Sequence, residues 1–244
     1  METLFAFVDA GDTLSARSAE QDSVETIGEF ATGIDNPFDN LVAKALATLP
    51  RPRGLDQGLA ITLEKNLPVA AGLGGGSADA GAVFRLVERL HGLPDDWQAR
   101  AAKLGADVPS CVRSEMAIGL GTGTELLPVE NDLAGTPVLL VNPRITLSTA
   151  SVFKAWEPRD LGPLPKGPAS QIMREGRNDL RAPAIAQCTA IADVLDALGQ
   201  TEPLFCEMSG SGATCFALFE TLDQRDETAQ AIAQQHPDWW QLAG

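Results

Sequence analysis

The sequence predicts an α+β fold built from two lobes. Segments with helical periodicity separate most of the strand-like segments, but residues 203–220 have the pattern strand, glycine turn, strand, which favours a hairpin over a doubly wound sheet. A proline-rich stretch at residues 157–170 is typical of a loop or a junction between lobes. The chain has 244 residues, which is enough for one large domain or two small ones.

Four elements are expected ahead of a glycine-rich segment at residues 68–81. They are strands at residues 4–8, 23–30 and within 58–68, and a helix at residues 38–49. The helix follows the turn signal Asn36-Pro37 and is stopped by a proline. The last strand alternates apolar and polar residues, which predicts that one of its faces is buried. Residues 9–14, "DAGDTL", are expected to form a turn.

Six further elements are expected after the glycine-rich segment. They are helices at residues 82–91, 95–105, 182–199 and 227–236, a buried strand at residues 138–143, and the hairpin at 203–220. The first of these helices has apolar residues at positions i, i+1, i+4, i+5 and i+8, and Gly92 ends it. The sequence therefore places the glycine-rich segment between a strand and an amphipathic helix.

Composition excludes several classes of function. The chain has 33 acidic and 18 basic residues, a net charge of −15, which disfavours nucleic acids and anionic membranes as partners. A nucleotide would need a local site made of backbone amides, a helix N-terminus and a few cations. Four cysteines without a CxxC pair argue against a zinc site or a disulfide scaffold and favour the reducing cytoplasm. The N-terminus lacks the basic region of a signal peptide.

The glycine-rich segment, "PVAAGLGGGSADAG", fits neither common nucleotide motif. A Walker loop needs a lysine before the final Ser or Thr, but here Ser77 follows Gly76 directly. The dinucleotide fingerprint counted from Gly72 would need a glycine where Ser77 stands. The feature shared with both motifs is a strand leading through glycines into a helix, whose first amides can bind a phosphate. The alternative is a tight turn with a serine cap.

The same segment closely resembles the P-x-x-x-G-L-G-G-G-S-[AS]-[DN]-A motif of the GHMP small-molecule kinases. In that family the loop wraps the phosphates of ATP without a P-loop lysine. Residues 208–219, "MSGSGATCFALF", resemble the family's C-terminal glycine loop. The stretches "LGADVPSCV" and "RNDLRAPA" and the opening "METLFAFVDAGDTL" resemble the branch that phosphorylates 4-diphosphocytidyl-2-C-methyl-D-erythritol.

The resemblance implies both the lobes and the site residues. An N-terminal lobe like domain 2 of ribosomal protein S5 would span residues 1–140, and a ferredoxin-like C-terminal lobe would span residues 141–244. The residues expected to bind ATP are Pro68, Ala70, Ala71, Gly72, Leu73, Gly74, Gly75, Gly76 and Ser77. Those expected to bind the substrate are Phe153, Ser209, Gly210, Ser211 and Gly212. Asp107 would be the catalytic base, and Phe153 would stack on cytosine.

Residue chemistry alone leaves simpler interpretations open for these positions. Asp107, next to Pro109, could serve as a turn or a helix cap. Residues 209–212 could form only a tight hairpin, and Phe153 could be a core residue. Ser77 could cap the helix or donate to a phosphate oxygen.

Four further residues are expected to have structural roles. Asn178 and Asp179 precede a helix and are expected to cap it. Lys65 could offset phosphate charge, but an exposed lysine at a strand end is the favoured interpretation. Asp79 is expected in the first helical turn, where an acid suits the helix dipole.

The function implied by the resemblance is ATP-dependent phosphorylation of the 2-hydroxyl of 4-diphosphocytidyl-2-C-methyl-D-erythritol, in non-mevalonate isoprenoid biosynthesis. ATP is the expected co-substrate, Mg²⁺ is expected with it, and its protein ligands are not predicted. A monomer or weak homodimer is expected. The alternatives are another GHMP kinase of the homoserine or mevalonate type, or a nucleotide-binding chain with little activity.

The resemblance begins past the first motif of the family. That motif carries P-A-K-[IV]-N-L, with a lysine at the reaction centre, and a Tyr-His pair that recognises cytidine follows it. This chain has no tyrosine and no lysine before Lys44. We therefore expect a chain shortened at its N-terminus, which turns over more slowly than one with the missing segment restored.

Overall fold

The computed structural model describes residues 1–33, 40–50, 58–159 and 161–244. The chain forms two compact units. The first comprises Met1–Phe7, Gly11–Val69 and Gly74–Val129, and the second comprises Val8–Ala10, Ala70–Leu73 and Glu130–Gly244. The expected turn at Asn36-Pro37 lies outside the described residues. No helix in the described ranges is long and apolar enough to cross a membrane.

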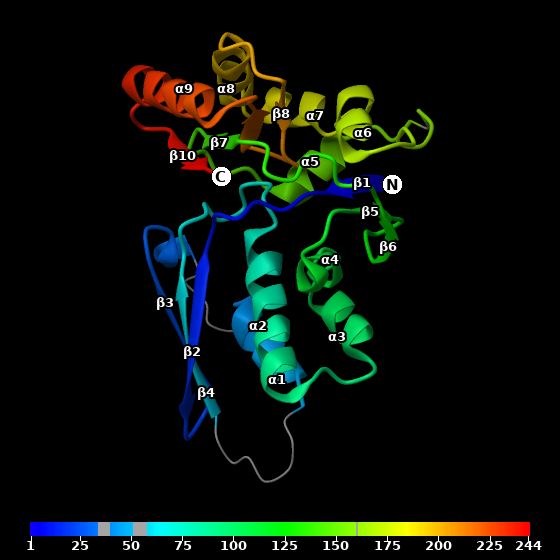
Figure 1. The fold of residues 1–244 in the computed structure, drawn as a ribbon, viewed down its shortest axis with the longest axis vertical. Helices are drawn as coiled ribbons and strands as arrows, with labels where there is room; N and C mark the ends of the chain where they lie inside the picture. The colour runs from blue at the N-terminus through cyan, green and yellow to red at the C-terminus, as the bar shows by residue number, and fades with distance from the viewer. Residues whose placement is uncertain (34–39, 51–57, 160) are drawn as a thin grey trace. The chain divides into compact units, whose positions relative to one another are not determined.

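The first unit contains a three-stranded sheet with helices along it (Figure 1). Its strands are β2 (Thr13–Ala19), β3 (Ser23–Ile27) and β4 (Gly58–Glu64), and its helices are α1 (Leu41–Thr48), α2 (Gly75–His91), α3 (Trp97–Leu104) and α4 (Val108–Arg113). A 3₁₀ turn covers Ala31–Gly33. The central strand β4 pairs antiparallel with β2 and parallel with β3. Its Ile61 and Leu63 are buried against Val83 and Phe84 of α2, which confirms the predicted alternation.

A second sheet of the first unit has the order β1-β5-β6. Its strands are β1 (Glu2–Phe5), β5 (Ala117–Leu120) and β6 (Glu125–Pro128), all antiparallel. The turn between β5 and β6 contains Gly121 and Gly123, both with positive φ. This hairpin places Gly123 beside Asp107, since a Cβ on Gly123 would lie 3.7 Å from Asp107 Oδ1.

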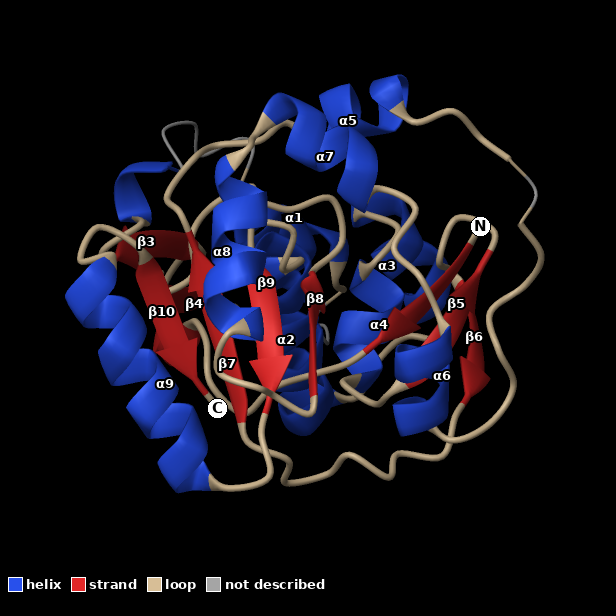
Figure 2. Ribbon diagram, turned by 90° about the horizontal axis from the view of Figure 1, so that it is seen from above, coloured by secondary structure: helices blue, strands red, loops and turns tan. Residues whose placement is uncertain are grey.

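The second unit is a four-stranded sheet of order β10-β7-β9-β8, with α8 and α9 on one face (Figure 2). Its strands are β7 (Val138–Asn142), β8 (Phe205–Met208), β9 (Cys215–Leu218) and β10 (Trp240–Ala243), all antiparallel. Its helices are α5 (Thr149–Ala155), α6 (Ala169–Glu175), α7 (Arg181–Gln187), α8 (Ala190–Gly199) and α9 (Leu222–Gln235). The expected boundary between residues 140 and 141 falls inside β7, which pairs with β9 and β10 and so belongs wholly to this unit.

Two sequence predictions are wrong in detail. Residues 13 and 14 do not end a turn but begin β2, because this polar strand is held by its pairing with β4. The single helix predicted at residues 182–199 is two helices, α7 and α8, since Cys188 adopts an extended φ of −142°. The break lets Ala184 of α7 and Ile191 of α8 enter the same hydrophobic core.

Candidate functional site

The N-terminus of α2 presents backbone amides that no side chain caps. Its N-cap is Gly74, with φ of 65°, and it has no side-chain hydrogen bond. Ser77 is the third residue of the helix, so the interpretation of Ser77 as the cap is wrong. Among the described residues, nothing lies within 4 Å of the position that a Cβ on Gly74 would occupy. The helix start therefore leaves its first N–H groups available to an anion.

The preceding part of the glycine-rich segment is held by the loop at residues 209–212. The Ser209 Oγ donates to the Gly72 carbonyl oxygen at 2.8 Å, and the Thr214 N–H donates to the Ala71 carbonyl oxygen at 3.1 Å. A Cβ on Gly72 would meet the Ser209 and Gly212 backbone at 2.4–2.8 Å. Only glycine fits this close approach, which also requires a φ of +77°. All these contacts lie within the second unit.

Asn178 braces the loop from its other side. Its Nδ2 donates to the carbonyl oxygens of Met208 at 2.9 Å and Gly210 at 2.8 Å. Its Oδ1 accepts from the Leu180 N–H at 3.0 Å, but Leu180 is itself the N-cap of α7. Among the described residues no side chain caps α7, so the prediction that Asn178 and Asp179 cap this helix is wrong. The bracing role was missed, because the two carbonyls lie 30 and 32 residues away in the sequence.

Ser211 is also fixed within the second unit. It is 5% exposed, and its hydroxyl shares a hydrogen bond of 2.9 Å with the Thr149 hydroxyl at the start of α5. Asn142 Nδ2 donates to Thr214 Oγ1 at 2.9 Å, just past the loop. The loop is therefore more than a hairpin turn, since Thr149 of α5 and Asn178 bond to it and Asn142 of β7 bonds to a residue just past it.

Asp107 lies between α3 and α4, at the N-cap position of α4, with Pro109 in that helix's first turn. Within the described part of the chain, no hydrogen-bond donor contacts its carboxylate, and the side chain does not cap α4. Burial raises the pKa of Asp107 above its ordinary value. A partly buried carboxylate with unused acceptor capacity can accept a proton, which is what a general base requires.

Close packing of α4 on α2 fixes where Asp107 lies. A Cβ on Gly81 of α2 would meet the Cys111 backbone of α4 at 2.6 and 2.7 Å, so only glycine permits this approach. At the entry to α4, the position of a Cβ on Gly105 lies 3.8 Å from the Ser77 Oγ. The turn that carries Asp107 is therefore next to the N-terminal turn of α2, within the first unit.

Lys65 is buried, so the prediction of an exposed lysine at a strand end is wrong. Its Nζ contacts Asp12 Oδ2 and lies 2.9 Å from Asp79 Oδ2. Asp79 is the fifth residue of α2, beyond its first turn, and its side chain is buried. The prediction that Asp79 interacts with the helix dipole is therefore wrong, and the residue pairs with Lys65 instead. Burial raises the pKa of Asp79 from 3.8 to about 6, more than the Lys65 ammonium lowers it.

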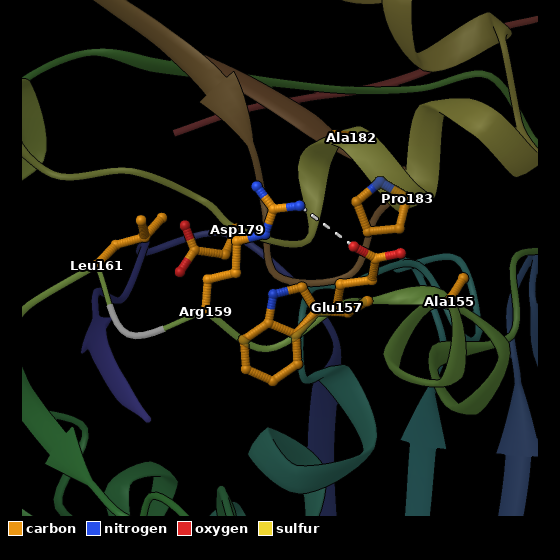
Figure 3. Close-up of a pocket in the computed structure, with 8 residues that line it drawn as sticks. Ala155, Glu157, Arg159, Leu161, Asp179, Ala182 and Pro183 are labelled. Atoms are coloured by element: carbon orange, nitrogen blue, oxygen red, sulfur yellow. Dashed lines mark hydrogen bonds and ion pairs between the residues drawn. The ribbon is translucent and has the colours of Figure 1, made fainter.

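Phe153 lies on α5 and is 36% exposed, so it is not a core residue. Its ring meets Trp156 edge to face, with centroids 6.3 Å apart. Trp156 also lines a pocket of about 350 Å³ between α5 and α7. Figure 3 shows Glu157 and Arg159 of this pocket joined by an ion pair of 3.4 Å. The pocket therefore offers a ligand both the aromatic surface of Trp156 and the charged side chains of Glu157, Arg159 and Asp179.

Comparison with known proteins identifies the family. Residues 40–115 match the family described as GHMP kinases N terminal domain, and residues 166–238 match GHMP kinases C terminal. A 4-diphosphocytidyl-2-C-methyl-D-erythritol kinase of Erythrobacter litoralis is 66% identical over 100% of this chain and 89% of its own length. The chain belongs to the GHMP kinase family. The kinase of the same name from Novosphingobium aromaticivorans is 61% identical over 100% of this chain and 83% of its own length.

Solved structures agree with this assignment. A crystal structure of 4-(cytidine 5'-diphospho)-2C-methyl-D-erythritol kinase superposes with a TM-score of 0.80 at 27% identity, covering 99% of this chain and 89% of that one. A homoserine kinase from Cytophaga hutchinsonii gives a TM-score of 0.67 at 18% identity, covering 97% and 86%, which shows the fold alone. The α+β GHMP kinase fold expected from the sequence is confirmed.

The predicted site residues of this GHMP kinase form two groups. In the first unit, Gly74–Ser77 and Asp107 lie near one another, and Pro68 precedes them in the chain. In the second unit, Ala70–Leu73 contact Ser209–Gly212. Residues missed by the sequence interpretation are Asp12, Thr149 and Thr214, together with the bracing role of Asn178. The sequence signal that could have identified them is weak, because a single polar residue in a turn looks like an ordinary capping residue.

Proposed function

We propose that this kinase transfers the γ-phosphoryl group of ATP to the 2-hydroxyl of 4-diphosphocytidyl-2-C-methyl-D-erythritol. The observation that carries the proposal is that two features occur together in the first unit. One is a glycine-rich helix start with no side-chain cap among the described residues, and the other is the Asp107 carboxylate, which no described donor contacts. The first can bind phosphate, and the second can take the proton of an alcohol. The choice of alcohol rests on the relatives at 66% and 61% identity, which carry this substrate in their names.

Each group then has a role in the transfer. The amides of Gly74–Ser77 bind phosphate oxygens, and Ala70–Leu73 lead the chain into that turn. Asp107 accepts the hydroxyl proton as the alcohol oxygen bonds to the γ-phosphorus, and the bond from that phosphorus to the bridging oxygen of ADP breaks. Asp107 becomes a carboxylic acid and returns its proton to water after ADP leaves.

On the substrate side, the amides of Gly210 and Ser211 bind the diphosphate of the alcohol, because the Ser209 and Gly212 N–H groups already donate to the Thr214 and Ser209 carbonyl oxygens. Phe153 stacks on the cytosine of the alcohol. The exposed ring of Phe153 and the hydrogen bonds that hold the loop to Thr149, Asn178 and Gly72 support these roles. The enzyme needs no other partner, and we expect it to work in the cytoplasm as a monomer or weak homodimer.

Mg²⁺ would arrive with the ATP phosphates and neutralise their charge. In the ranges that the structure describes, no three His, Cys, Asp or Glu side chains form a metal-binding group. This fits a metal held mainly by substrate phosphates, as is usual for Mg²⁺ in kinases.

The test is acceptor choice by the purified chain. ADP release is measured with ATP and one of three alcohols: the cytidyl methylerythritol, homoserine or mevalonate. We expect release with the cytidyl alcohol alone, and ³¹P NMR should place the new phosphate on the 2-hydroxyl. Release with homoserine or mevalonate instead, or with none of the three, would contradict the proposal.

A further inference from the structure

Three charged side chains are buried together behind the start of α2. Lys65, Asp12 and Asp79 are 3%, 4% and 7% exposed at their side chains. The Lys65 ammonium contacts both carboxylates, so its charge is already used inside the protein. Burying three charges is costly unless each is paired and hydrogen-bonded, as these are. None of the three has a part in the transfer described above.

This group, called here the Lys65 anchor (Asp12, Lys65 and Asp79), lies directly against the turn that presents the amides. A Cβ on Gly75, the first residue of α2, would be 3.5 Å from Asp12 Oδ2 and 3.6 Å from Lys65 Nζ. The anchor also holds the chain that leads into the loop, because Asp12 Oδ1 accepts from the N–H groups of Asn66 and Leu67 at 2.7 and 2.9 Å.

The start of α2 needs such support. Its N-cap is Gly74 and its first two residues are Gly75 and Gly76, and a glycine within a helix is less favourable than alanine by up to about 1 kcal/mol. No side chain caps this end, so the usual local stabilisation is missing. The glycines give a ligand close access to the backbone, but they leave the first turn poorly defined by its own sequence.

The Lys65 backbone is fixed as firmly as its side chain. Its N–H donates to the Ile27 carbonyl oxygen at 2.7 Å, and its carbonyl oxygen accepts from the Phe30 N–H at 3.1 Å. Lys65 therefore joins the ends of β3 and β4, where its backbone lies, to Asp79 in α2. Through these contacts Lys65 links the position of the sheet to that of the helix start.

We propose that the Lys65 anchor fixes the N-terminal turn of α2 in the conformation that binds the phosphates of ATP, which makes Lys65, Asp12 and Asp79 positioning residues of this kinase. The inference rests on the proposed use of that turn for ATP. It assigns Lys65 no contact with the nucleotide, because both carboxylates occupy its ammonium.

The main test variant is the double substitution Lys65→Met with Asp79→Leu. Lys65→Met alone strands two buried carboxylates, and such a chain is expected to fold poorly. The double variant removes one charge of each sign, so the net charge is kept, and Asp12 retains its two backbone donors. Asp79→Asn is the conservative variant, since its amide oxygen can still accept from Lys65. Lys103→Met changes an exposed lysine of α3 and is the matched control.

The readouts are amide hydrogen exchange at residues 75–79 and steady-state kinetics, both well below the unfolding temperature. In the double variant we expect exchange there, and the KM for ATP, to rise about tenfold, with the KM for the alcohol changed less than about twofold. Asp79→Asn and Lys103→Met should stay close to the wild type. A folded double variant with unchanged exchange and unchanged KM for ATP would overturn the anchor, as would a fall in kcat alone.

The experiments distinguish failure of the proposed function from failure of the anchor proposal. If the wild-type chain phosphorylates none of the alcohols, the activity is wrong, while exchange at residues 75–79 and ATP affinity by calorimetry still test the anchor. A tenfold loss of ATP affinity in the double variant, with faster exchange, would then support it. Unchanged affinity and exchange would refute it.

Discussion

The Ser209 hydroxyl donates a hydrogen bond to the backbone carbonyl oxygen of Gly72, with 2.8 Å between the two oxygens. The two residues are 137 positions apart in the sequence. Beside this bond, the Thr214 N–H donates to the Ala71 carbonyl oxygen. The two glycine-rich motifs that mark the family are therefore hydrogen-bonded to each other, within the second unit.

Ser209→Ala should destabilise this junction. One neutral hydrogen bond is worth about 0.5–1.5 kcal/mol, and the Gly72 carbonyl loses its hydroxyl partner. We expect the free energy of unfolding in urea to fall by about that amount. Ser209→Thr keeps the hydroxyl and should lose less. Equal losses in the two variants would show that the hydroxyl bond does not contribute.

Gly72→Ala should be far more damaging. The added Cβ would lie 2.4 Å from the Ser209 carbonyl oxygen, and the φ of +77° is unfavourable for alanine. A loss of about 2–4 kcal/mol of unfolding free energy is expected. Gly199→Ala, at the end of α8 with no described atom within 4 Å, is the control and should be neutral or stabilising. A Gly72→Ala protein as stable as wild type would show that the loop can move apart.

Asp107→Asn should abolish most of the chemistry and leave the fold intact. An amide cannot take the hydroxyl proton, so kcat is expected to fall about 10²–10⁴-fold with little change in either KM. Because burial raises the pKa of Asp107, the acid limb of the wild-type kcat profile should lie above the ordinary carboxyl range. Asp95→Asn, at an exposed position, is the control. Full activity of Asp107→Asn would remove it as the base.

Asp79→Asn should change how stability depends on pH. The folded-state pKa of Asp79 is raised from 3.8 to about 6, so the folded chain binds this proton more tightly than the unfolded chain. The stability that the proton confers is complete below the unfolded pKa and is lost as pH rises through about 6. Facing Lys65 and Asp12 stay in place in the variant.

The amide cannot ionise, so the stability of Asp79→Asn relative to wild type should increase as pH rises from 3.8 to about 6, and change little above that. Urea unfolding across that range measures it, and Asp95→Asn, the same substitution at an exposed position, is the control. A pH-independent difference between Asp79→Asn and wild type would mean that Asp79 does not carry this proton.

Asn178→Asp should separate the two roles of Asn178. The carboxylate can still accept from the Leu180 N–H, but it cannot donate to the carbonyls of Met208 and Gly210. We expect the KM for the cytidyl alcohol to rise about tenfold or more, because two braces of the loop are lost. Asp179→Asn is the control, since its pair with Arg177 is partly exposed and worth little. An unchanged KM would restrict Asn178 to its hydrogen bond with Leu180, in the turn ahead of α7.

Much of the fold could be predicted because local patterns dominate it. The alternation in β4 and the periodicity of α2 reflect burial of one face, and Gly92 and Gly105 end their helices as expected. Strand β2, with the sequence TLSARSA, was missed because it has no such pattern and depends on pairing with β4. Helices α4, α5 and α6 have only six or seven residues each, too few for a periodicity to show.

The sequence by itself determined the family and the position of the glycine-rich helix start, since both depend on residues that are contiguous in the chain. Only the tertiary structure decided that Lys65 is buried in an ion pair, because its partner Asp12 is 53 residues away in the sequence. It likewise decided that no donor in the described ranges contacts the Asp107 carboxylate and that Ser209 holds Gly72. Burial and long-range hydrogen bonds are set by neighbours in space, and no local pattern records them.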